Sequence, residues 1–381
     1  MDFKKIRVLH VFGDLGCAGG AEKWFLEILK LQDPRIQFDF ITSVCNKSVA
    51  DEVTALGATI HYIPFSHSSI PFCIFNPYLN SARKILQQHK YDVLHVHQFD
   101  LAGELLRIAQ LEQVKTRVMT IHASKYDNPR ILRRLAYLIC GKNWIFKHAT
   151  NILPCSQYAA QSFNCTNPLK TKIIYPAINP TYYNLNSKKQ SQLKSYYQNI
   201  FNIPPNSITI GHIGRFTKQK NHQFLIKLLA QLIQDNKNIH ALLIGTGELL
   251  PKIKQDIVKL DLQKHIILAG KRNDVPNIIN SIFDVLVLPS LYEGLPIVAL
   301  EALASGLAVV LSDKITTELD DYFSNRIFRE KLEIKNWLNA IPLAINAKIN
   351  NQEAMTEFLN SPFNIKNSLE NLINIYNKAL K

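Results

Sequence analysis

The chain has 381 residues, of which 47% are hydrophobic and 19% charged, a globular composition that excludes intrinsic disorder. The length exceeds what one ordinary core accommodates, so two domains are expected. The net charge of +14 predicts an anionic partner: a nucleotide phosphate, a nucleic acid or an acidic membrane surface. No apolar run in the sequence approaches the ~20 residues of a spanning helix, so we expect a cytoplasmic protein, soluble or peripheral on the inner face of the membrane.

The N-terminal stretch MDFKKIRVLHVFGDLG predicts a buried first strand, because its apolar run is too short for a signal peptide. Six cysteines lie scattered through the first half without a CxxC pair: Cys17, Cys45, Cys73, Cys140, Cys155 and Cys165. This usage is typical of reduced thiols in the cytosol and argues against disulfides and a zinc site.

Strand-like apolar runs alternate with amphipathic segments along the first half. The expected strands are 7–12, 38–44, 59–63, 93–97, 117–122 and 151–154. Helices are expected between them, for example over 21–31 and 77–89. Apolar strands that alternate with helices predict a parallel sheet covered by helices on both faces.

The second half repeats the pattern. Its expected strands are 208–213, 240–244, 266–268, 285–289 and 308–311. We therefore expect an α/β fold with two Rossmann-like, doubly wound domains that face each other across a cleft at the carboxyl ends of their strands.

The expected domain boundary lies in the segment YPAINP, residues 175–180, where two prolines bracket a change of element. The first domain would span 1–175 and the second 176–361. An amphipathic C-terminal helix over about 362–381 can pack back on the first domain. A polar stretch over 184–206 predicts an exposed helix and loop.

The segment GHIGRFTKQKN follows an expected strand and precedes an expected helix. Gly214 allows a tight turn there. Arg215 and Lys220 stand five residues apart across that turn, so both cations can converge on one anion; a planar fork and a point charge suit a diphosphate. An ordinary basic surface loop fits the same residues. Downstream, GTGE at 245–248 is typical of a tight strand-to-helix turn and is weak evidence for a ligand.

The segment YEGLPIVALEALASG, residues 292–306, predicts a loop at the carboxyl end of a strand, followed by a helix. The backbone amides of the loop would lie at the helix N-terminus, where the helix dipole favours an anion. The residues at this position are Gly294, Leu295, Pro296 and Ile297. All of them except Pro296 carry a backbone N–H. Glu293 in the loop and Glu301 in the helix can accept hydrogen bonds from sugar hydroxyls. A capped helix with solvated glutamates is the alternative.

Together these motifs resemble glycosyltransferase family 4, the retaining transferases of GT-B fold. The E-x7-E motif is formed by Glu293 and Glu301, the GRF-x-x-QKN motif spans 214–221, and a GGAE segment stands at 19–22. The run FDVLVLPSLYEGLPIVALEALASGLAVVLSD is similar to the signature block of the family. The resemblance covers most of the chain and is more specific in the second half.

The resemblance implies roles in the donor site. Arg215 and Lys220 would hold the donor diphosphate and stabilise the charge of the leaving group. Glu301 would hold the ribose hydroxyls, and Glu293 would contact the transferred sugar. The amides over 295–297 would meet the distal phosphate.

Further positions follow from the same resemblance. Gly19 and Gly20 would close over the phosphates or the acceptor, and Arg272 and Val275 would face the base. His122, in the segment TIHAS, matches the family's histidine that contacts the transferred sugar, although a core or surface histidine fits as well.

Metal binding is not expected. His95 and His97 lie on one face of a strand, but no third ligand follows at a telling spacing. The chain contains no Asp-x-Asp motif, which other transferases use to hold a divalent metal. Cations and a helix N-terminus can replace that metal, so we expect metal-independent transfer without a cofactor.

The implied reaction moves a sugar from a nucleotide-sugar donor, with UDP-sugars favoured, to a glycan or lipid-linked acceptor with retention of anomeric configuration. The donor would bind mainly to the second domain, and closure would expel water. The segment 125–147 carries six basic residues and one acid among apolar ones, which is typical of a helix on an anionic membrane surface or of a core helix with a basic edge.

Other functions fit parts of the sequence. A nucleotide-sugar epimerase has a similar fold but needs acid and base residues around the sugar. A phosphorylase needs a lysine that binds pyridoxal phosphate, and no clear candidate stands out. A nucleic-acid-binding protein fits the charge of +14 but lacks cations interleaved with aromatic residues. No nucleic acid is therefore expected as a partner. An inactive transferase conflicts with the intact motif residues.

Overall fold

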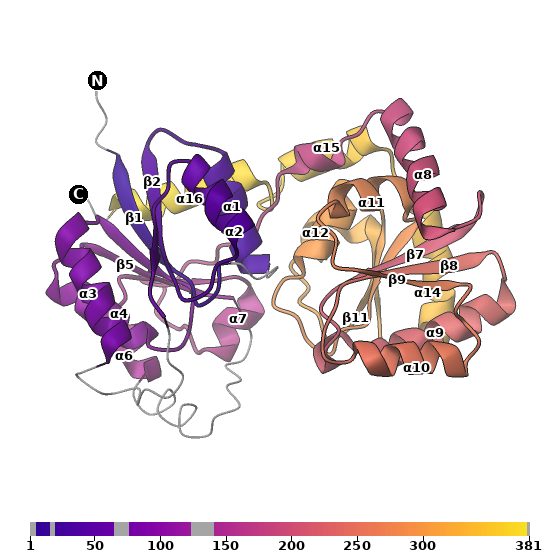
Figure 1. Ribbon diagram of the computed structural model, residues 1–381, viewed down its shortest axis with the longest axis horizontal. Helices are drawn as coiled ribbons and strands as arrows, with labels where there is room; N and C mark the ends of the chain where they lie inside the picture. The colour runs from indigo at the N-terminus through magenta and orange to yellow at the C-terminus, as the bar shows by residue number, and fades with distance from the viewer. Residues whose placement is uncertain (1–4, 16–19, 65–75, 123–140, 379–381) are drawn as a thin grey trace. The chain divides into compact units, whose positions relative to one another are not determined.

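The computed structural model describes residues 5–15, 20–64, 76–122 and 141–378. The chain forms two compact units, shown in Figure 1. The first unit comprises Met1–Pro176 together with Ile365–Lys381, and the second comprises Ala177–Asn364. Each unit contains one six-stranded parallel sheet, as the alternating sequence pattern predicts.

The first sheet has the order β3-β2-β1-β4-β5-β6. Its strands are β1 (Ile6–Val11), β2 (Ile36–Thr42), β3 (Ile60–Tyr62), β4 (Val93–Val96), β5 (Thr116–Ile121) and β6 (Asn151–Pro154). The helices of this unit are α1 (Gly20–Lys30), α2 (Lys47–Ala55), α3 (Pro77–His89), α4 (Ala102–Leu111), α6 (Lys142–His148), α7 (Gln157–Ser162) and α16 (Ile365–Lys378).

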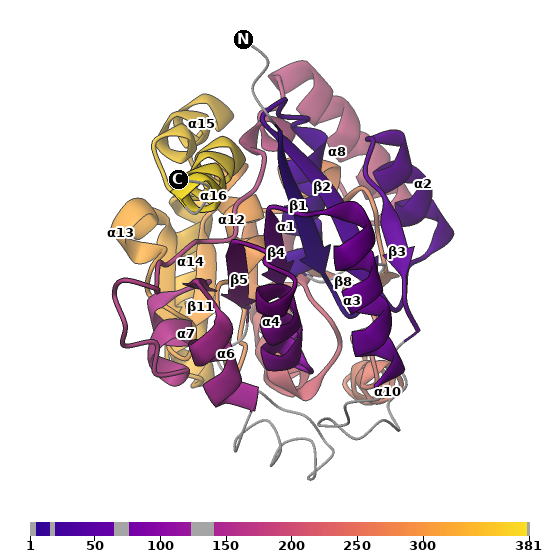
Figure 2. The ribbon, with the colours of Figure 1, turned by 90° about the vertical axis from the view of Figure 1, so that its left-hand side faces the viewer.

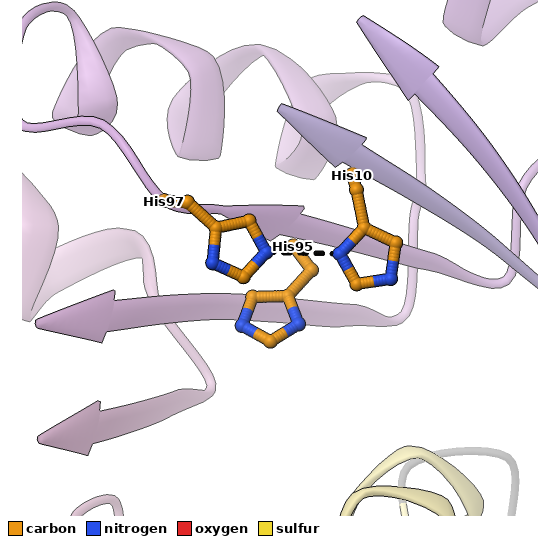
Figure 3. A group of neighbouring side chains, drawn as sticks. All are labelled: His10, His95 and His97. Atoms are coloured by element: carbon orange, nitrogen blue, oxygen red, sulfur yellow. Dashed lines mark hydrogen bonds between the residues drawn. The ribbon is translucent and has the colours of Figure 1, made fainter. Parts of the chain in front are cut away.

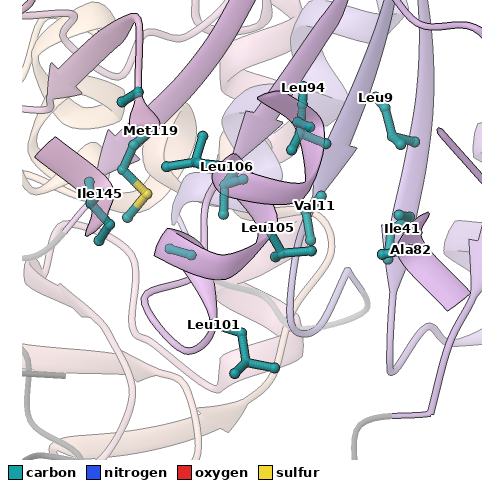
Figure 4. Packing of buried hydrophobic residues seen from close by; sticks show 14 of the residues in the cluster. Leu9, Val11, Ile41, Ala82, Leu94, Leu101, Leu105, Leu106, Met119 and Ile145 are labelled. Atoms are coloured by element: carbon teal, nitrogen blue, oxygen red, sulfur yellow. The ribbon is translucent and has the colours of Figure 1, made fainter. Parts of the chain in front are cut away.

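Side chains alternate between the two faces of the first sheet. On one face, Leu9, Val11 and Leu94 are buried with side chains of α3, α4 and α6, and Figure 4 shows Leu105 and Leu106 of α4 packed among them. On the opposite face, His10 contacts Phe25 of α1. The first face is therefore an aliphatic core, whereas the second carries rings and polar groups.

The C-terminal helix α16 belongs to the first unit. The indole Nε1 of Trp24 in α1 donates a 3.1 Å hydrogen bond to the hydroxyl of Ser368 in α16. The α16 residues Leu372 and Tyr376 are fully buried. Figures 1 and 2 show α16 on the face of the first sheet opposite to α3 and α4. The chain thus returns to its first unit at its end.

The second sheet has the order β12-β11-β10-β7-β8-β9. Its strands are β7 (Ile208–Ile213), β8 (Ile239–Ile244), β9 (Ile266–Gly270), β10 (Val285–Leu288), β11 (Val309–Ser312) and β12 (Ile327–Glu330). Its α-helices are α8 (Ser187–Phe201), α9 (His222–Asp235), α10 (Leu250–Lys259), α11 (Val275–Ile282), α12 (Ile297–Ala304), α13 (Asp320–Phe323), α14 (Ile334–Asn346) and α15 (Asn351–Leu359). Short 3₁₀ turns occur at Pro180–Tyr183, Lys218–Lys220 and Ser324–Arg326.

Local sequence signals explain where helices begin. The side chain of Asn76 accepts a 3.0 Å hydrogen bond from the amide of Tyr78, and Pro77 occupies the first turn of α3, where its missing N–H costs nothing. Asn186 caps α8 in the same way, since it accepts a 2.9 Å bond from the amide of Lys189. The polar stretch that predicts an exposed helix over 184–206 is therefore α8 and its flanks.

Both sheets share one topology. In each, the first strand of the unit lies between the second and the fourth, so the order reverses between β1 and β4 and between β7 and β10. The loops at the carboxyl ends of such a pair diverge, and ligands of open parallel sheets bind there. The candidate ligand-binding loops are therefore those after β1 and β4 in the first unit, and those after β7 and β10 in the second.

The sequence pattern did not predict β12 or the helices α13 to α15. All four residues of β12 are half-buried, and the strand contains Arg329 and Glu330, so it lacks the apolar run of a buried strand. Of the basic segment 125–147, residues 125–140 lie outside the part that the structure describes. None of the helices within the described ranges has the length and hydropathy of a membrane-spanning segment.

Candidate active site

Two loops of the second unit are joined at the reversal point of its sheet. The amide of Leu291, after β10, donates a 2.8 Å hydrogen bond to the carbonyl of Gln219, after β7. The side chain of Gln219 donates to the carbonyl of Tyr292 at 2.9 Å and to Oε2 of Glu293 at 3.3 Å. Lys220 Nζ forms an ion pair with Oε1 of Glu293. A cation and a carboxylate from distant parts of the chain are thus held side by side.

Both members of this ion pair are largely enclosed. The side chains of Lys220 and Glu293 are 15% and 11% exposed. Glu293 also forms a parallel β-bridge with Ile315, which fixes its backbone beyond the end of β11. Limited exposure reduces solvent screening, so the attraction between the two charges is stronger than that of a pair on the surface. An ammonium group suits a phosphate and a carboxylate suits sugar hydroxyls.

Glycines allow the adjacent turns to pack closely. A Cβ on Gly214 would lie 3.1 Å from Cε of Lys220, so this glycine leaves room for the lysine stem. Gly245 has a φ of +142°, and a Cβ there would lie 2.0 Å from the carbonyl oxygen of Gly214. A Cβ on Gly247 would lie 2.5 Å from the carbonyl oxygen of Phe216. The GTGE turn therefore supports the loop after β7 through its backbone.

The helix α12 begins directly after this loop. Leu295 and Pro296 are buried, whereas Gly294 and Ile297 are half-buried. Glu301 is 3% exposed in the second turn of α12. The N-terminus of α12 therefore follows Glu293 by a few residues, and its dipole adds positive potential beside Lys220.

The remaining cations predicted for the donor site differ in their surroundings. Arg215 is exposed, and its guanidinium has no ion pair within the described ranges. Arg272 Nε donates a 2.8 Å hydrogen bond to Oδ1 of Asp274, which lowers the pKa of this carboxyl. Tyr197 of α8 donates a 2.8 Å bond to the other carboxylate oxygen. Val275 is the buried first residue of α11. Arg272 is therefore held by its own turn.

Histidines occupy the carboxyl edge of the first sheet. His122 follows β5 and is half-buried, and its Nε2 lies 3.0 Å from Nδ1 of His97 after β4. Nε2 of His97 lies 2.9 Å from Nδ1 of His10 in β1. Figure 3 marks this hydrogen bond with a dashed line. His95 is paired in register with His10 and contacts Thr120 and Tyr376 instead. His122, which the family resemblance assigns to the sugar contact, thus lies at one end of a row of three histidine rings: His10, His97 and His122.

These histidines are neutral at physiological pH. Burial lowers the pKa of His10 and of His122 to about 3. Burial also lowers the pKa of His95 and of His97 well below the usual value, and neighbouring histidines lower it further. Gly20 is the exposed first residue of α1, and Gly19 lies outside the described residues.

The sequence matches two family models. The model for glycosyl transferases group 1 matches residues 194–357, and the model for Glycosyltransferase Family 4 matches residues 18–182. The chain belongs to glycosyltransferase family 4 and is an enzyme of GT-B fold. The resemblance of the sequence motifs to this family is thereby confirmed.

Several curated proteins and solved structures resemble this chain over nearly its whole length. The EpsF protein of Bacillus subtilis (strain 168) is 28% identical over 385 residues, covering 99% of this chain and 98% of its own. A UDP-Gal:alpha-D-GlcNAc-diphosphoundecaprenol alpha-1,3-galactosyltransferase of Escherichia coli is 27% identical, covering 98% of this chain and 97% of its own. The crystal structure of Anabaena HepE in complex with UDP-glucose has a TM-score of 0.79 at 17% identity, covering 98% and 100% of the two chains.

Some of the motif residues of this glycosyltransferase are in direct contact, and others are not. Lys220 and Glu293 form an ion pair, whereas Arg272 pairs with Asp274 and has no contact with either of them within the described ranges. The sequence motifs alone did not single out Gln219, which bridges both loops and lies inside the GRF-x-x-QKN motif. They also assigned no role to His10, whose position between Leu9 and Val11 in the apolar part of β1 was the available signal.

Proposed function

We propose that this glycosyltransferase moves a hexosyl group from a UDP-sugar to a lipid-linked or glycan acceptor, with retention of configuration and without a metal ion. The observation that carries the proposal is the enclosed pair of Lys220 and Glu293 at the reversal point of the second sheet. Lys220 would bind the diphosphate, and Glu293 would accept hydrogen bonds from the transferred sugar. The UDP complexes of HepE and the UDP-sugar in the name of the Escherichia coli relative favour uridine.

Charge compensation without a metal follows from the same residues. Arg215 is exposed and available to a second phosphate oxygen, and the N-terminus of α12 adds its dipole. Glu301 would hold the ribose, the amides after Glu293 would meet the distal phosphate, and the turn that carries Arg272 and Val275 would face the base. These groups would stabilise the negative charge that develops on the departing diphosphate.

The transfer step is proposed as attack on the face that the diphosphate leaves. The acceptor oxygen forms a bond to the anomeric carbon while the bond between that carbon and the diphosphate oxygen breaks. The proton of the acceptor hydroxyl passes to the departing phosphate, so no protein base is required. His122 would contact a hydroxyl of the transferred sugar, and Gly19 and Gly20 would lie near the phosphates or the acceptor.

The acceptor is proposed to be lipid-linked, because the Escherichia coli relative is named for a diphosphoundecaprenol-linked substrate. The six basic residues of 125–147 would bring the enzyme to an anionic membrane surface at the cytoplasmic side. Co-sedimentation with vesicles of anionic and of zwitterionic lipid tests this: binding only to the anionic vesicles, weakened by salt, is expected.

Thermal stabilisation by a panel of UDP-, GDP- and ADP-sugars in EDTA tests the donor site. A ligand that binds the folded state raises its stability with ln(1 + [L]/Kd). We expect UDP-sugars alone to stabilise the wild type, and Lys220→Ala to lose the effect. Lys252→Ala, an exposed lysine of α10, is the matched control and should keep it. No shift with any UDP-sugar, or an equal shift in Lys220→Ala, would refute the assignment.

A further inference from the structure

Three histidines of the first unit form a row of ring-to-ring contacts that ends at the proposed sugar contact. His10 lies in β1, His97 follows β4 and His122 follows β5, so each ring comes from a neighbouring strand. The contacts run from Nδ1 of His10 to Nε2 of His97 at 2.9 Å and from Nδ1 of His97 to Nε2 of His122 at 3.0 Å. Both nitrogens of the middle ring are therefore used.

Such a row couples the tautomers of its members. A neutral imidazole has one N–H donor and one bare acceptor nitrogen. In each contact, one nitrogen must carry the hydrogen and the other must not. Because both nitrogens of His97 are engaged, the tautomer of His10 fixes that of His97, which fixes that of His122. Burial, which lowers the pKa of all three, keeps them neutral as this requires.

The surroundings of His10, at the end of the row farthest from His122, decide in which direction the hydrogen bonds of the row run. Nε2 of His10 is buried without a hydrogen-bond partner in the described part of the chain, and Phe25, Phe38 and Phe40 surround the ring at centroid distances of 4.9, 5.0 and 5.6 Å. A buried donor is left unpaired less often than a buried acceptor. The hydrogen of His10 therefore belongs on Nδ1 and points into the row rather than into the phenylalanines.

We propose that His10 and His97 are positioning residues that hold His122 as the tautomer with its hydrogen on Nδ1. His10 Nδ1–H donates to His97 Nε2, and His97 Nδ1–H donates to His122 Nε2. His122 then presents a fixed N–H donor to a hydroxyl oxygen of the transferred sugar. This inference rests on the proposed contact between His122 and that sugar.

The neighbouring His95 gives the main competing explanation. His10, His95 and His97 offer three nitrogens within 4.8 Å of one another, a spacing that can hold a metal ion. However, His95 Nδ1 lies 2.7 Å from the hydroxyl of Tyr376, and its Nε2 lies 2.6 Å from that of Thr120. A metal would have to break these contacts or the row itself, and it would bring charge into an aromatic core. A row of hydrogen bonds therefore explains the placement of these rings better than a metal site does.

The first test is the tautomer in the ligand-free wild type. Nitrogen NMR of the histidine-labelled protein distinguishes a protonated from a bare ring nitrogen, and His122→Gln identifies the signals of His122. We expect a hydrogen on Nδ1 and a bare Nε2 in His122, without stoichiometric zinc in the protein. A hydrogen on Nε2, or zinc retained by wild type and lost in His95→Ala, would overturn the inference. This readout is independent of the identity of the donor.

The second test uses two substitutions of the remote ring. His10→Asn keeps an N–H where Nδ1 stood, whereas His10→Leu removes it. For hydrolysis of the UDP-sugar that binds best, measured as UDP release, we expect His10→Leu to lower kcat about tenfold, the equivalent of one neutral hydrogen bond, with KM unchanged. His10→Asn should stay within about twofold, as should the control His240→Leu, a buried histidine of β8.

The outcomes separate this inference from the proposed function. Equal losses in His10→Asn and His10→Leu would indicate a structural role only and would overturn the inference. A failure of every UDP-sugar to bind would refute the proposed donor, while the NMR tautomer of His122 would still be read from the free protein. If His10→Leu does not fold, the wild-type spectrum alone decides.

Discussion

Replacing Lys220 by methionine tests whether the donor loop is held together by its ion pair. Methionine keeps most of the length of the lysine stem but removes the charge. Glu293 would then remain 11% exposed without its cation, although Gln219 Nε2 still donates to its other oxygen at 3.3 Å. The loss therefore comes mainly from a carboxylate left in a site with little solvent.

The expected magnitude follows from the enclosure. Removing one partner of a buried ion pair costs about 3 to 5 kcal/mol, and the partial exposure here favours the lower end. We expect Lys220→Met to lower the free energy of unfolding by about 3 kcal/mol and Glu293→Gln to lower it by about 1.5 kcal/mol, because a lysine reaches water more easily. The double substitution should cost only about 2 kcal/mol, since no charge is stranded.

Scanning calorimetry of the full-length protein measures these changes. For a unit of this size, 1 kcal/mol corresponds to about 2 to 4 °C, so Lys220→Met should lower the transition of the second unit by about 6 to 12 °C. The double variant should be more stable than Lys220→Met while still failing to bind the nucleotide sugar. Costs that simply add, within about 0.5 kcal/mol, would show that the pair contributes nothing and would refute the reasoning.

Three further predictions concern the glycine turn, the metal and the histidines. Gly245→Ala should lower donor affinity at least tenfold and destabilise the protein, because the new Cβ would lie 2.0 Å from the carbonyl of Gly214; a donor titration with normal affinity would contradict this. Activity should be unchanged by EDTA and by added Mg²⁺, which an initial-rate assay checks; a loss in EDTA restored by the metal would contradict metal independence. The lowered pKa of His10 means that the unfolded chain binds a proton below pH 6.5 that the folded chain does not bind until about pH 3. Its contribution to stability is therefore present above pH 6.5 and is lost as the pH falls, by about 1.4 kcal/mol at pH 5.5, so His10→Asn should lose less stability than wild type between pH 7 and 5.5 in urea titrations. Equal losses would show that His10 titrates normally.

Most strands of this fold could be predicted from the sequence because most of them are buried on both faces of the sheet. Val285–Leu288 is a run of apolar residues with no exposed side chain, which only a central parallel strand requires. The edge strand β12 lies half-buried and contains charged residues, so burial imposes no such run on it. A strand could therefore be predicted where it carries an apolar run, and β12, which carries none, was missed.

The sequence predicted which motif residues belong to the candidate site, but it did not predict which of them are in contact. Lys220 and Glu293 stand 73 residues apart, and their ion pair exists because the sheet places β7 beside β10. The histidine row has the same origin, since β1 and β4 pair with His10 opposite His95. The spacing of residues along the chain does not show which strands are neighbours in a sheet. The ion pair and the histidine row could therefore be found only once the strand order was known.

The return of α16 to the first unit has a consequence for biosynthesis. The amide of Ile178 donates a 3.0 Å hydrogen bond to the carbonyl of Phe363, so the second unit is an insertion whose two ends meet. A ribosome therefore releases every residue of the inserted unit before the outer one receives its last helix. Until Tyr376 emerges, His95 lacks the hydroxyl that lies 2.7 Å from its Nδ1 in the finished protein. A premature stop near the end of the message would thus damage the half of the enzyme encoded first.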